Sequence, residues 1–528
     1  MGIEDSALLR KFVNVGEKKA GSPKMGIIVG LFAAVGGILF GYDTGTISGV
    51  MGMDYVKRTF PANGHSFTSS ESSLIVSILS VGTFFGALIA PIPSDRIGRR
   101  WTLILSSLIV FNIGTILQTA STSIPLLCVG RVIAGFGVGL ISAVVPLYQA
   151  ETTPKWIRGA IVSCYQFAIT IGIFLAACIN QGTHKIDGSA CYRIPIGVQF
   201  LWAIILGVGI YFLPETPRFY VSKGRESEAK ESLRRLRSLP IDHPEILDEY
   251  EDIVAAHEFE AQFGKATWGL VFSNKNRQRR RLLMGTTIQG LQQLTGINFI
   301  FYFGTSFFQS AGIKNPFTIS LATNIVNVGS TIPGILLIEI LGRRKLLLSG
   351  SLVMCVSQFI VAIVGVAAGQ ESDSANKCLV AFTCIFIAAF AASWGPLCWA
   401  VVSETYALNV RQKSISLCTA SNWLWNWAIA YATPYMVNSG PGNANLGSKV
   451  FFIWGGFNFI GGVFVYFMVF ESKGLSLEQV DEMYEKVKYA QKSWAFVPTE
   501  HAFRHSTAAS INSTGKAEAI SEVEDASV

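Results

Sequence analysis

Asp95-Arg96-Ile97-Gly98-Arg99-Arg100 and Glu339-Ile340-Leu341-Gly342-Arg343-Arg344 are two versions of one motif, and each version follows an apolar run of the chain. In both, an acidic residue stands three positions before a glycine, and two arginines follow the glycine directly. This repeat indicates that one unit was duplicated.

A second motif repeats in the same order. Glu151 precedes Arg158 in the first half of the chain, and Glu404 precedes Arg411 in the second half. All four positions follow apolar runs, as the first motif does. Two nested repeats of the same polarity predict two parallel halves, related by an axis along the normal of a membrane.

The composition is that of a protein with many membrane spans. Half of the 528 residues are hydrophobic and 15% are charged, whereas about 25% of an ordinary soluble domain is charged. Apolar runs of about 20 residues, the length that crosses a bilayer core, recur along the chain. We expect twelve transmembrane helices, at 26–50, 72–92, 101–120, 125–147, 159–179, 195–213, 282–310, 318–340, 346–368, 379–402, 413–437 and 450–470.

The basic residues predict the orientation of these spans. If the N-terminus is cytoplasmic, few of the 42 Lys and Arg residues lie in outer loops, namely Lys57, Arg58, Lys185, Arg193, Lys314, Lys377 and Lys449. Basic residues concentrate on the cytoplasmic side of membrane proteins, so we expect both termini to be cytoplasmic. The net charge of +7 then reflects topology and attraction to an anionic inner leaflet, and we expect no nucleic-acid partner.

Five segments follow from this pattern. A polar stretch between the two halves has a helical, amphipathic pattern with Leu233, Leu236 and Ile246 on its apolar face. The end of the tail has few large apolar residues and is expected to be disordered. The predicted segments are a cytoplasmic N-terminal segment (1–25), a six-helix half (26–213), a cytoplasmic helical linker (214–281), a second six-helix half (282–470) and a cytoplasmic tail (471–528).

The stretch GTTIQGLQQLTGIN, residues 285–298, places amide side chains inside an otherwise apolar run. Gln289, Gln292 and Gln293 stand at i, i+3 and i+4, so they share one face of a helix, and Gly296 loosens the helix before Asn298. Each amide offers both a donor and an acceptor, which suits an uncharged ligand with many hydroxyls, such as a sugar. The alternative is hydrogen bonding between helices, which contributes about 0.6 kcal/mol per contact.

Asp43 and Arg131 are charges that we place in the middle of spans. Either charge alone would cost several kcal/mol there, and an ionisable group inside a membrane indicates function. We expect the two to pair. A static buried salt bridge is the alternative.

Ten motifs along the chain resemble those of the sugar porter family of the major facilitator superfamily, in the branch of the fungal monosaccharide transporters. They lie at 36–45, 95–100, 130–131, 151–159, 214–218, 292–298, 342–344, 395–399, 422–423 and 471–474. The resemblance extends from the first span to just past the twelfth. Two positions depart from it: Phe470 stands where the family usually has Pro, and Phe303 follows Tyr302 where some members carry a second Tyr.

The resemblance implies an all-α membrane protein with the major facilitator fold. It implies a sugar site lined by Gln166, Gln292, Gln293, Asn298, Asn327, Trp399, Asn422 and Trp423. An indole can stack on the apolar face of a pyranose while amides bind its hydroxyls; hydrogen bonding between helices remains the alternative for Asn327 and Asn422. Phe40, Tyr302 and Phe303 are candidate gate aromatics, with packing as the alternative.

The resemblance also implies two charged devices. In the first, protonation of Asp43 releases Arg131 and drives proton-coupled transport, although members that only facilitate diffusion carry the same pair. In the second, charges at the cytoplasmic ends of the spans form an inter-span clamp that holds the outward-facing state. The clamp residues are Asp95, Arg99, Arg100, Glu151, Arg158, Glu215, Arg218, Glu339, Arg343, Arg344, Glu404, Arg411 and Glu471.

We find no phosphate loop, HExxH or GxSxG motif in the sequence, so we expect neither an enzyme nor a cofactor. The predicted function is uptake of a hexose, glucose foremost, across the plasma membrane by a monomer working through alternating access, with a proton as second substrate. Facilitated diffusion without protons is one alternative. A sugar sensor is another, although sensors of that type tend to need a longer tail than the roughly 55 residues that follow the last span.

Overall fold

The computed structural model describes residue 22 and residues 24–61, 67–154, 157–261, 267–310, 316–367, 373–438 and 441–498. Every regular element within these ranges is a helix, as the sequence predicts. The predicted N-terminal segment and the end of the tail lie almost entirely outside the described residues.

Six spans make up the first half. The first is α2 (Lys24–Ala33) with α3 (Val35–Gly52), and the third is built from α7 (Arg99–Leu105), a π-helical segment η2 (Ser106–Phe111) and α8 (Asn112–Ala120). The remaining helices are α4 (Asp54–Thr59), α5 (Ser69–Ile89), α6 (Pro91–Ile97), α9 (Ile124–Thr152), α10 (Arg158–Thr183), α11 (Ala190–Gly197) and α12 (Gln199–Phe212).

The second half follows the linker helices α13 (Pro217–Ser222), α14 (Glu226–Arg237), α15 (Pro244–Ala261) and α16 (Trp268–Val271), and the short 3₁₀ turn η3 (Lys275–Arg277). Its spans are built from α17 (Gln278–Leu294), α18 (Ile297–Ser310), α19 (Pro316–Leu341), α20 (Arg343–Ala367), α21 (Asp373–Ala392), α22 (Trp394–Thr405), α23 (Leu408–Val437) and α24 (Val450–Met468). The 3₁₀ turn η4 (Gly447–Lys449) precedes α24, and α25 (Leu477–Lys486) and the 3₁₀ turn η5 (Ala490–Ala495) follow it.

Ten helices within the described residues are long and apolar enough to cross a membrane. They coincide with ten of the twelve predicted spans. The other two, predicted at 282–310 and 413–437, are the spans that carry the candidate sugar-binding amides of the second half, except Asn327. The first of these is divided between α17 and α18, and the second, α23, carries Asn422 and Asn426 among its apolar residues. Both departures from an uninterrupted apolar helix therefore fall where the candidate site lies: the helix break in the first of these two spans and the asparagines in the second.

The break between α17 and α18 lies at Gly296, whose φ of +84° favours glycine because it has no Cβ. A Cβ at this position would also meet the indole of Trp454. The carbonyl oxygen of Thr295, freed by the break, accepts hydrogen bonds from Gln358 Nε2 at 2.8 Å and Asn458 Nδ2 at 3.3 Å. The interruption is thus stabilised by side chains from two other helices.

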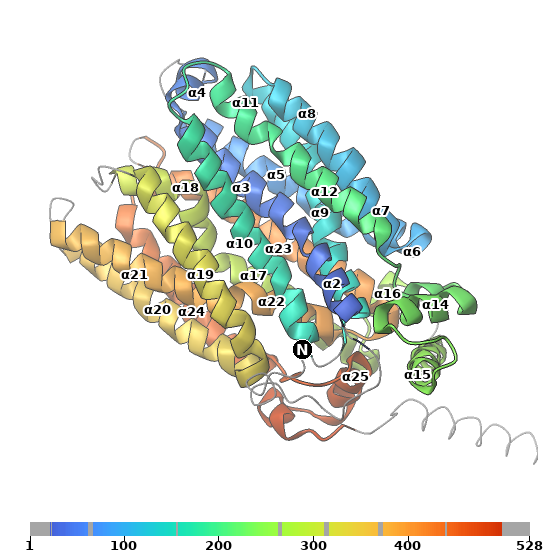
Figure 1. Cartoon of the computed structure of the whole chain (residues 1–528). Coiled ribbons are helices and arrows are strands. Elements are labelled where there is room, and N and C mark those ends of the chain that lie inside the picture. Colours follow the sequence, from blue (N-terminus) through green and yellow to red (C-terminus); the bar gives the residue numbers. More distant parts are fainter. Residues whose placement is uncertain are drawn as a thin grey trace, which may run out of the picture.

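Several helix pairs bring the halves together, among them α5 with α23, α10 with α19 and with α22, and α3 with α18. In Figure 1 the long helices run together, with α4 at one end of the bundle and the start of α2, α14, α15 and α25 at the other. We call the latter the linker end. There Leu233 on α14 packs with Ile246 and Ile253 on α15, which confirms the amphipathic pattern predicted for the linker.

Candidate functional site

A cluster of amides joins α17, α18 and α23. Asn422 Nδ2 donates to Gln289 Oε1 at 2.7 Å and to Gln292 Oε1 at 2.8 Å, while Gln293 Nε2 donates to Asn422 Oδ1 at 2.8 Å. Asn298 Nδ2 donates to Gln293 Oε1 across the helix break. These side chains are at most 8% exposed. The predicted face of Gln289, Gln292 and Gln293 is confirmed, because all three meet Asn422.

Two indoles of the second half, on α22 and α23, meet the first half in the same region. Trp399 Nε1 donates to Gln166 Oε1 on α10 at 3.2 Å. Trp423 Nε1 donates to Ser142 Oγ on α9 at 3.1 Å, and its ring meets Phe40 edge-on at 4.7 Å between centroids. Four predicted residues, Gln166, Trp399, Trp423 and Phe40, therefore lie at the interface between the halves.

Asn327 on α19 differs from the other predicted amides. It is 1% exposed, and neither its Oδ1 nor its Nδ2 has a hydrogen-bond partner among the described residues. A buried amide without partners costs about 1–3 kcal/mol per group. Such a group is explained where a ligand or water supplies the missing bonds, but within the described residues no side-chain hydrogen bond links Asn327 to the amide cluster.

The arrangement can bind a neutral, hydroxyl-rich molecule by exchanging hydrogen bonds between the amides for hydrogen bonds to its hydroxyls. The cluster amides hydrogen-bond one another, so a hydroxyl that enters replaces an existing bond instead of filling an empty position. Each net hydrogen bond is then worth about 1 kcal/mol, and indoles can add apolar contact with a sugar ring. Within the described residues no group of His, Cys, Asp and Glu could hold a metal ion.

Two of the predicted gate aromatics, Tyr302 and Phe303, lie on α18, beyond the helix break that separates them from the glutamines. The carbonyl oxygen of Tyr302 accepts from Ser48 Oγ on α3 at 3.1 Å, and Tyr302 OH donates to Asn426 Oδ1 at 3.2 Å. Ser80 Oγ on α5 donates to the same Asn426 oxygen at 2.7 Å. Phe303 is half-buried beside Tyr302. α18 is thus tied to the first half, and Asn426 links it to the amide cluster.

Asp43 on α3 and Arg131 on α9 form the predicted pair. Arg131 Nη1 lies 3.4 Å from Asp43 Oδ2, and the two side chains are 1% and 0% exposed. Gln199 Nε2 on α12 donates to the other carboxylate oxygen at 3.2 Å. Arg131 Nε and Nη2 have no hydrogen-bond partner among the described residues. The pair is therefore buried and only partly satisfied.

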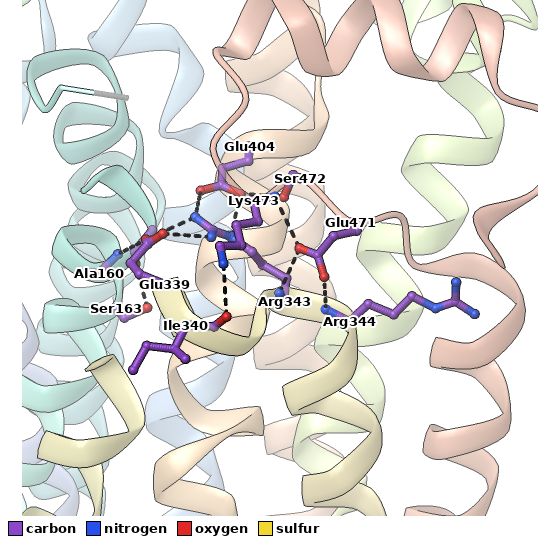
Figure 2. A network of polar contacts seen from close by, with 11 residues as sticks. Ala160, Ser163, Glu339, Ile340, Arg343, Arg344, Glu404, Glu471, Ser472 and Lys473 are labelled. Atoms are coloured by element: carbon purple, nitrogen blue, oxygen red, sulfur yellow. Dashed lines mark hydrogen bonds and ion pairs between the residues drawn. The ribbon is translucent and has the colours of Figure 1, made fainter. Parts of the chain in front are cut away.

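The clamp of the second half is centred on Arg343 (Figure 2). Its guanidinium bonds both oxygens of Glu339 at 3.1 and 3.2 Å and both oxygens of Glu404 at 3.0 and 3.3 Å. Glu471 accepts from the backbone N–H groups of Arg343 and Arg344, and Ser472 Oγ donates to Glu404. One cation is therefore held by two carboxylates.

The clamp of the first half repeats this plan with one carboxylate fewer. Arg99 Nη2 donates to Glu151 Oε1 at 3.2 Å, and Arg99 Nε forms an ion pair with Glu151 Oε2 at 3.2 Å. Glu215 accepts from the backbone N–H groups of Arg100 and Thr216, each at 2.9 Å, as Glu471 does in the second half. Burial raises the pKa of Glu215, while these N–H bonds and Arg99 oppose the shift.

Asp95, at the position equivalent to Glu339, is half-exposed. Its carboxylate makes no hydrogen bond with Arg99 in the described structure and lies 4.0 Å from Lys413 Nζ. The reason is length, because aspartate is one methylene shorter than glutamate.

The clamp of the second half also crosses to the first half. Glu339 Oε1 accepts from the backbone N–H of Ala160 at 3.1 Å, at the start of α10. Arg343 Nη2 lies so close to Gly159 that a Cβ there would overlap it. The halves are therefore in direct contact at the linker end in this structure.

The remaining predicted clamp residues lie nearby. Arg411 donates to the backbone oxygen of Tyr406 through Nε and Nη2. Arg158 is buried at the start of α10, and Arg218 is half-buried on α13. Arg344 donates to the backbone oxygens of Ala490 and Tyr466.

Sequence reasoning missed several polar residues of these sites. Asn426 stands four positions after Asn422, so it lies on the same helix face, and this spacing could have identified it. Gln199, which bonds Asp43, gave no signal beyond being a polar residue in an apolar run. Ser80 and Ser142 gave none, because serine is common in membrane helices.

Known proteins resemble the chain over most of its length. The family described as "Sugar (and other) transporter" matches residues 29–484. The "Major facilitator-type transporter ecdD" of Aspergillus rugulosus is 52% identical over 497 residues, which cover 91% of each chain. The "High glucose sensor RGT2" of Saccharomyces cerevisiae is 48% identical over 88% of this chain and 61% of its own length. The "Probable glucose transporter rco-3" of Neurospora crassa is 47% identical over 91% of this chain and 82% of its own length.

One solved structure has the same fold. It is that of the proton:xylose symporter XylE bound to 6-bromo-6-deoxy-D-glucose, with a TM-score of 0.77 and 25% identity, and the alignment covers 88% of this chain and 100% of that one. Family match, relatives and fold agree with the duplicated twelve-span architecture predicted from the sequence. The chain therefore belongs to the sugar transporter family of the major facilitator superfamily, whose members are transporters and not enzymes.

Proposed function

We propose that this chain takes up a hexose, glucose foremost, across the plasma membrane as a monomer by alternating access, with the linker end and both termini in the cytoplasm. The observation that carries the proposal is the buried amide cluster of Gln292, Gln293, Asn298 and Asn422 beside the interface of the halves, with two indoles completing it. Uncharged amides suit a neutral sugar. The name of the Neurospora relative supports glucose.

Removal of single amides tests the site. Gln292→Ala, Gln293→Ala and Asn298→Ala each take away a group that would bond a sugar hydroxyl, at a cost of about 1–3 kcal/mol. We expect glucose affinity to fall about tenfold or more in each variant, measured as glucose binding to purified protein and as uptake by transport-deficient cells. Asn112→Ala is the control, because its amide donates within its own helix at Leu108. If all three variants transported normally, the sugar site would lie elsewhere.

We further propose that the Asp43–Arg131 pair couples a proton to the sugar. Both groups are buried inside spans, where protonation of Asp43 would release Arg131 and allow α3 and α9 to rearrange. The proton symporter XylE has the same fold, which favours this reading over facilitated diffusion.

An imposed pH gradient tests the coupling. In proteoliposomes that are acidic outside, we expect the wild type to accumulate glucose. Asp43→Asn, which mimics the protonated form permanently, should lose accumulation yet keep exchange between equal glucose concentrations. Asp54→Asn removes an exposed carboxylate on α4 and should behave like the wild type. If the wild type ignores the gradient, the pair is structural and the chain is a facilitator.

The similarity to the sensor RGT2 supports a second candidate function, in which the chain binds sugar and signals without transporting it. The same proteoliposome measurement separates the two functions. A transporter moves labelled glucose across the membrane, whereas a sensor binds glucose with no flux.

A further inference from the structure

A basic cavity of about 570 Å³ lies at the linker end of the first half, outside the sugar site. Its wall combines residues of α6, α7, α13 and the start of the linker. The lining residues are Arg96, Ile97, Arg100, Trp101, Leu105, Glu215, Phe219, Tyr220 and Arg225.

The charge of the cavity is positive. Three arginines line it against one carboxylate, Glu215, and both oxygens of that carboxylate already accept backbone N–H groups. Arg225 is exposed and pairs with Glu228 on α14. Arg96 is exposed and forms no hydrogen bond or ion pair within the described part of the chain. The cavity therefore presents guanidinium groups that can bind an oxyanion.

One wall of the cavity is apolar and faces outward. Ile97, Trp101 and Leu105 are 39%, 45% and 40% exposed, and Trp101 and Leu105 belong to a membrane-spanning helix. Tyr211 and Phe212, at the end of α12, are exposed beside Trp101. Aromatic residues of this kind mark the level of lipid headgroups. The basic cavity thus opens at the height where the spans leave the bilayer.

The second half shows what the equivalent arginine binds. Arg344, the counterpart of Arg100, donates through Nη1 to the carbonyl oxygen of Ala490 at 2.8 Å, so the segment after α24 supplies an oxygen to it. Arg344 also donates to the backbone oxygen of Tyr466, and Arg100 donates in the same way to the backbone oxygen of Tyr211. No described segment gives Arg100 a counterpart of the Ala490 oxygen. The buried Nε has no hydrogen-bond partner among the described residues in either arginine, so the two differ in this one bond.

We propose that this cavity binds the phosphate of an anionic phospholipid from the leaflet at the linker end, with Arg96, Arg100 and Arg225 around the headgroup and the acyl chains along Ile97, Trp101 and Leu105. The phosphate oxygens take the place that the Ala490 oxygen has in the second half. A free phosphate shares the headgroup chemistry, but only a lipid also uses the apolar wall.

The test compares lipid binding to the full-length protein in detergent by native mass spectrometry. The probes are dioleoyl phosphatidylserine, dioleoyl phosphatidylcholine and inorganic phosphate. The double variant Arg96→Gln/Arg225→Gln removes two exposed cations of the cavity and leaves Arg100 of the clamp in place. The control Lys230→Gln/Arg234→Gln removes two cations that pair within α14 and do not line the cavity.

We expect the wild type and the control to bind phosphatidylserine more tightly than phosphatidylcholine. The cavity variant should bind phosphatidylserine roughly tenfold or more weakly, with its unfolding temperature in lipid-free detergent unchanged. Equal phosphatidylserine affinity in the wild type and the cavity variant would overturn the proposal, as would an equal loss in the control. Inorganic phosphate that binds with the same dependence on Arg96 and Arg225 would overturn the lipid as the source of the phosphate.

Discussion

The two clamps share one local plan and differ in how many carboxylates surround the central arginine. Gly98 and Gly342 precede the arginines with φ of +97° and +84°, and Glu215 and Glu471 bind the backbone N–H groups that follow. Arg343 bonds two carboxylates, one of which also reaches the first half, whereas Arg99 bonds only Glu151. The repeat thus sets the local geometry of both clamps, while the acidic residues at the equivalent positions differ: Glu339 holds Arg343 and reaches Ala160 of the first half, whereas Asp95 lies 4.0 Å from Lys413 of the second half.

Neutralising the two arginines should show this difference most strongly. Arg343→Gln leaves Glu339 and Glu404 buried without their cation, and breaking a buried ion pair from one side costs about 3–5 kcal/mol. Arg99→Gln leaves only Glu151 in that state. We expect both variants to slow uptake with little change in equilibrium glucose binding, and Arg343→Gln to lower the unfolding temperature and the uptake rate more.

Lys345→Gln is the control for these variants, since it removes an exposed charge two positions after Arg343. A large loss of glucose binding with intact cycling, in either arginine variant, would show that the clamp assignment is wrong.

Alanine at the two clamp glycines should have the next largest effect. A Cβ at Gly98 would overlap the carboxylate of Glu215, and one at Gly342 would overlap that of Glu471. We expect each variant to lose about 1 kcal/mol from the positive φ and about 1–3 kcal/mol more from the overlap, measured as a drop in thermal stability.

Gly224 and Gly474 separate the two causes. They have φ of +68° and +75°, and a Cβ on either would have no atom within 4 Å. Gly224→Ala and Gly474→Ala should therefore show only the cost of the backbone conformation. Equal destabilisation of all four variants would mean that the carboxylates move aside freely.

Exchanging the acidic residues at positions 95 and 339 should have the smallest effect. The two exchanges should change the closure of the linker end in opposite directions. Asp95→Glu can give Arg99 a second carboxylate, and Glu339→Asp withdraws one from Arg343 and from the backbone of Ala160. Each added or lost charged hydrogen bond is worth about 1.5–3 kcal/mol, partly offset by side-chain ordering. We expect Asp95→Glu to slow the transport cycle by strengthening closure, and Glu339→Asp to weaken closure, as measured by the accessibility to thiol reagents of a cysteine placed near Gly159.

The double variant Asp95→Glu/Glu339→Asp keeps the total number of carboxylates around the two central arginines, but gives two of them to Arg99 and one to Arg343. If Asp95→Glu left the cycle unchanged, side-chain length would not explain the difference between the clamps.

Much of the fold could be predicted because membrane spans follow from apolar length alone. The spans at 72–92 and 346–368 begin and end within a few residues of α5 and of α20. The π-helical segment Ser106–Phe111 was not predicted, because one additional residue per turn leaves no mark on an apolar run. Gly296 was identified from the sequence because glycine weakens a helix. The structure places the helix break at this residue.

The candidate site was predicted less completely. Gln292, Gln293 and Asn422 stand out because amides are costly in a membrane, so each must meet a partner. The bonds between Ser142 and Trp423 and between Ser80 and Asn426 could not be found, because the approach of distant helices depends on packing and not on local pattern. The bond from Gln199 to Asp43 was missed for the same reason.

The break at Gly296 divides one span into two mechanical parts. α17, with Gln289, Gln292 and Gln293, packs against α22 and α23 of its own half, whereas α18 packs against α3 of the other half through Ser48 and Tyr302. A rigid helix would transmit any swing of its outer end to the glutamines, and the amide cluster would be pulled apart whenever the pathway opened. With the break, α18 can swing about Gly296 while the glutamines of α17 keep their positions. Opening of the pathway then costs a few hydrogen bonds between α18 and the first half, and the bonds between the glutamines and α23 are kept.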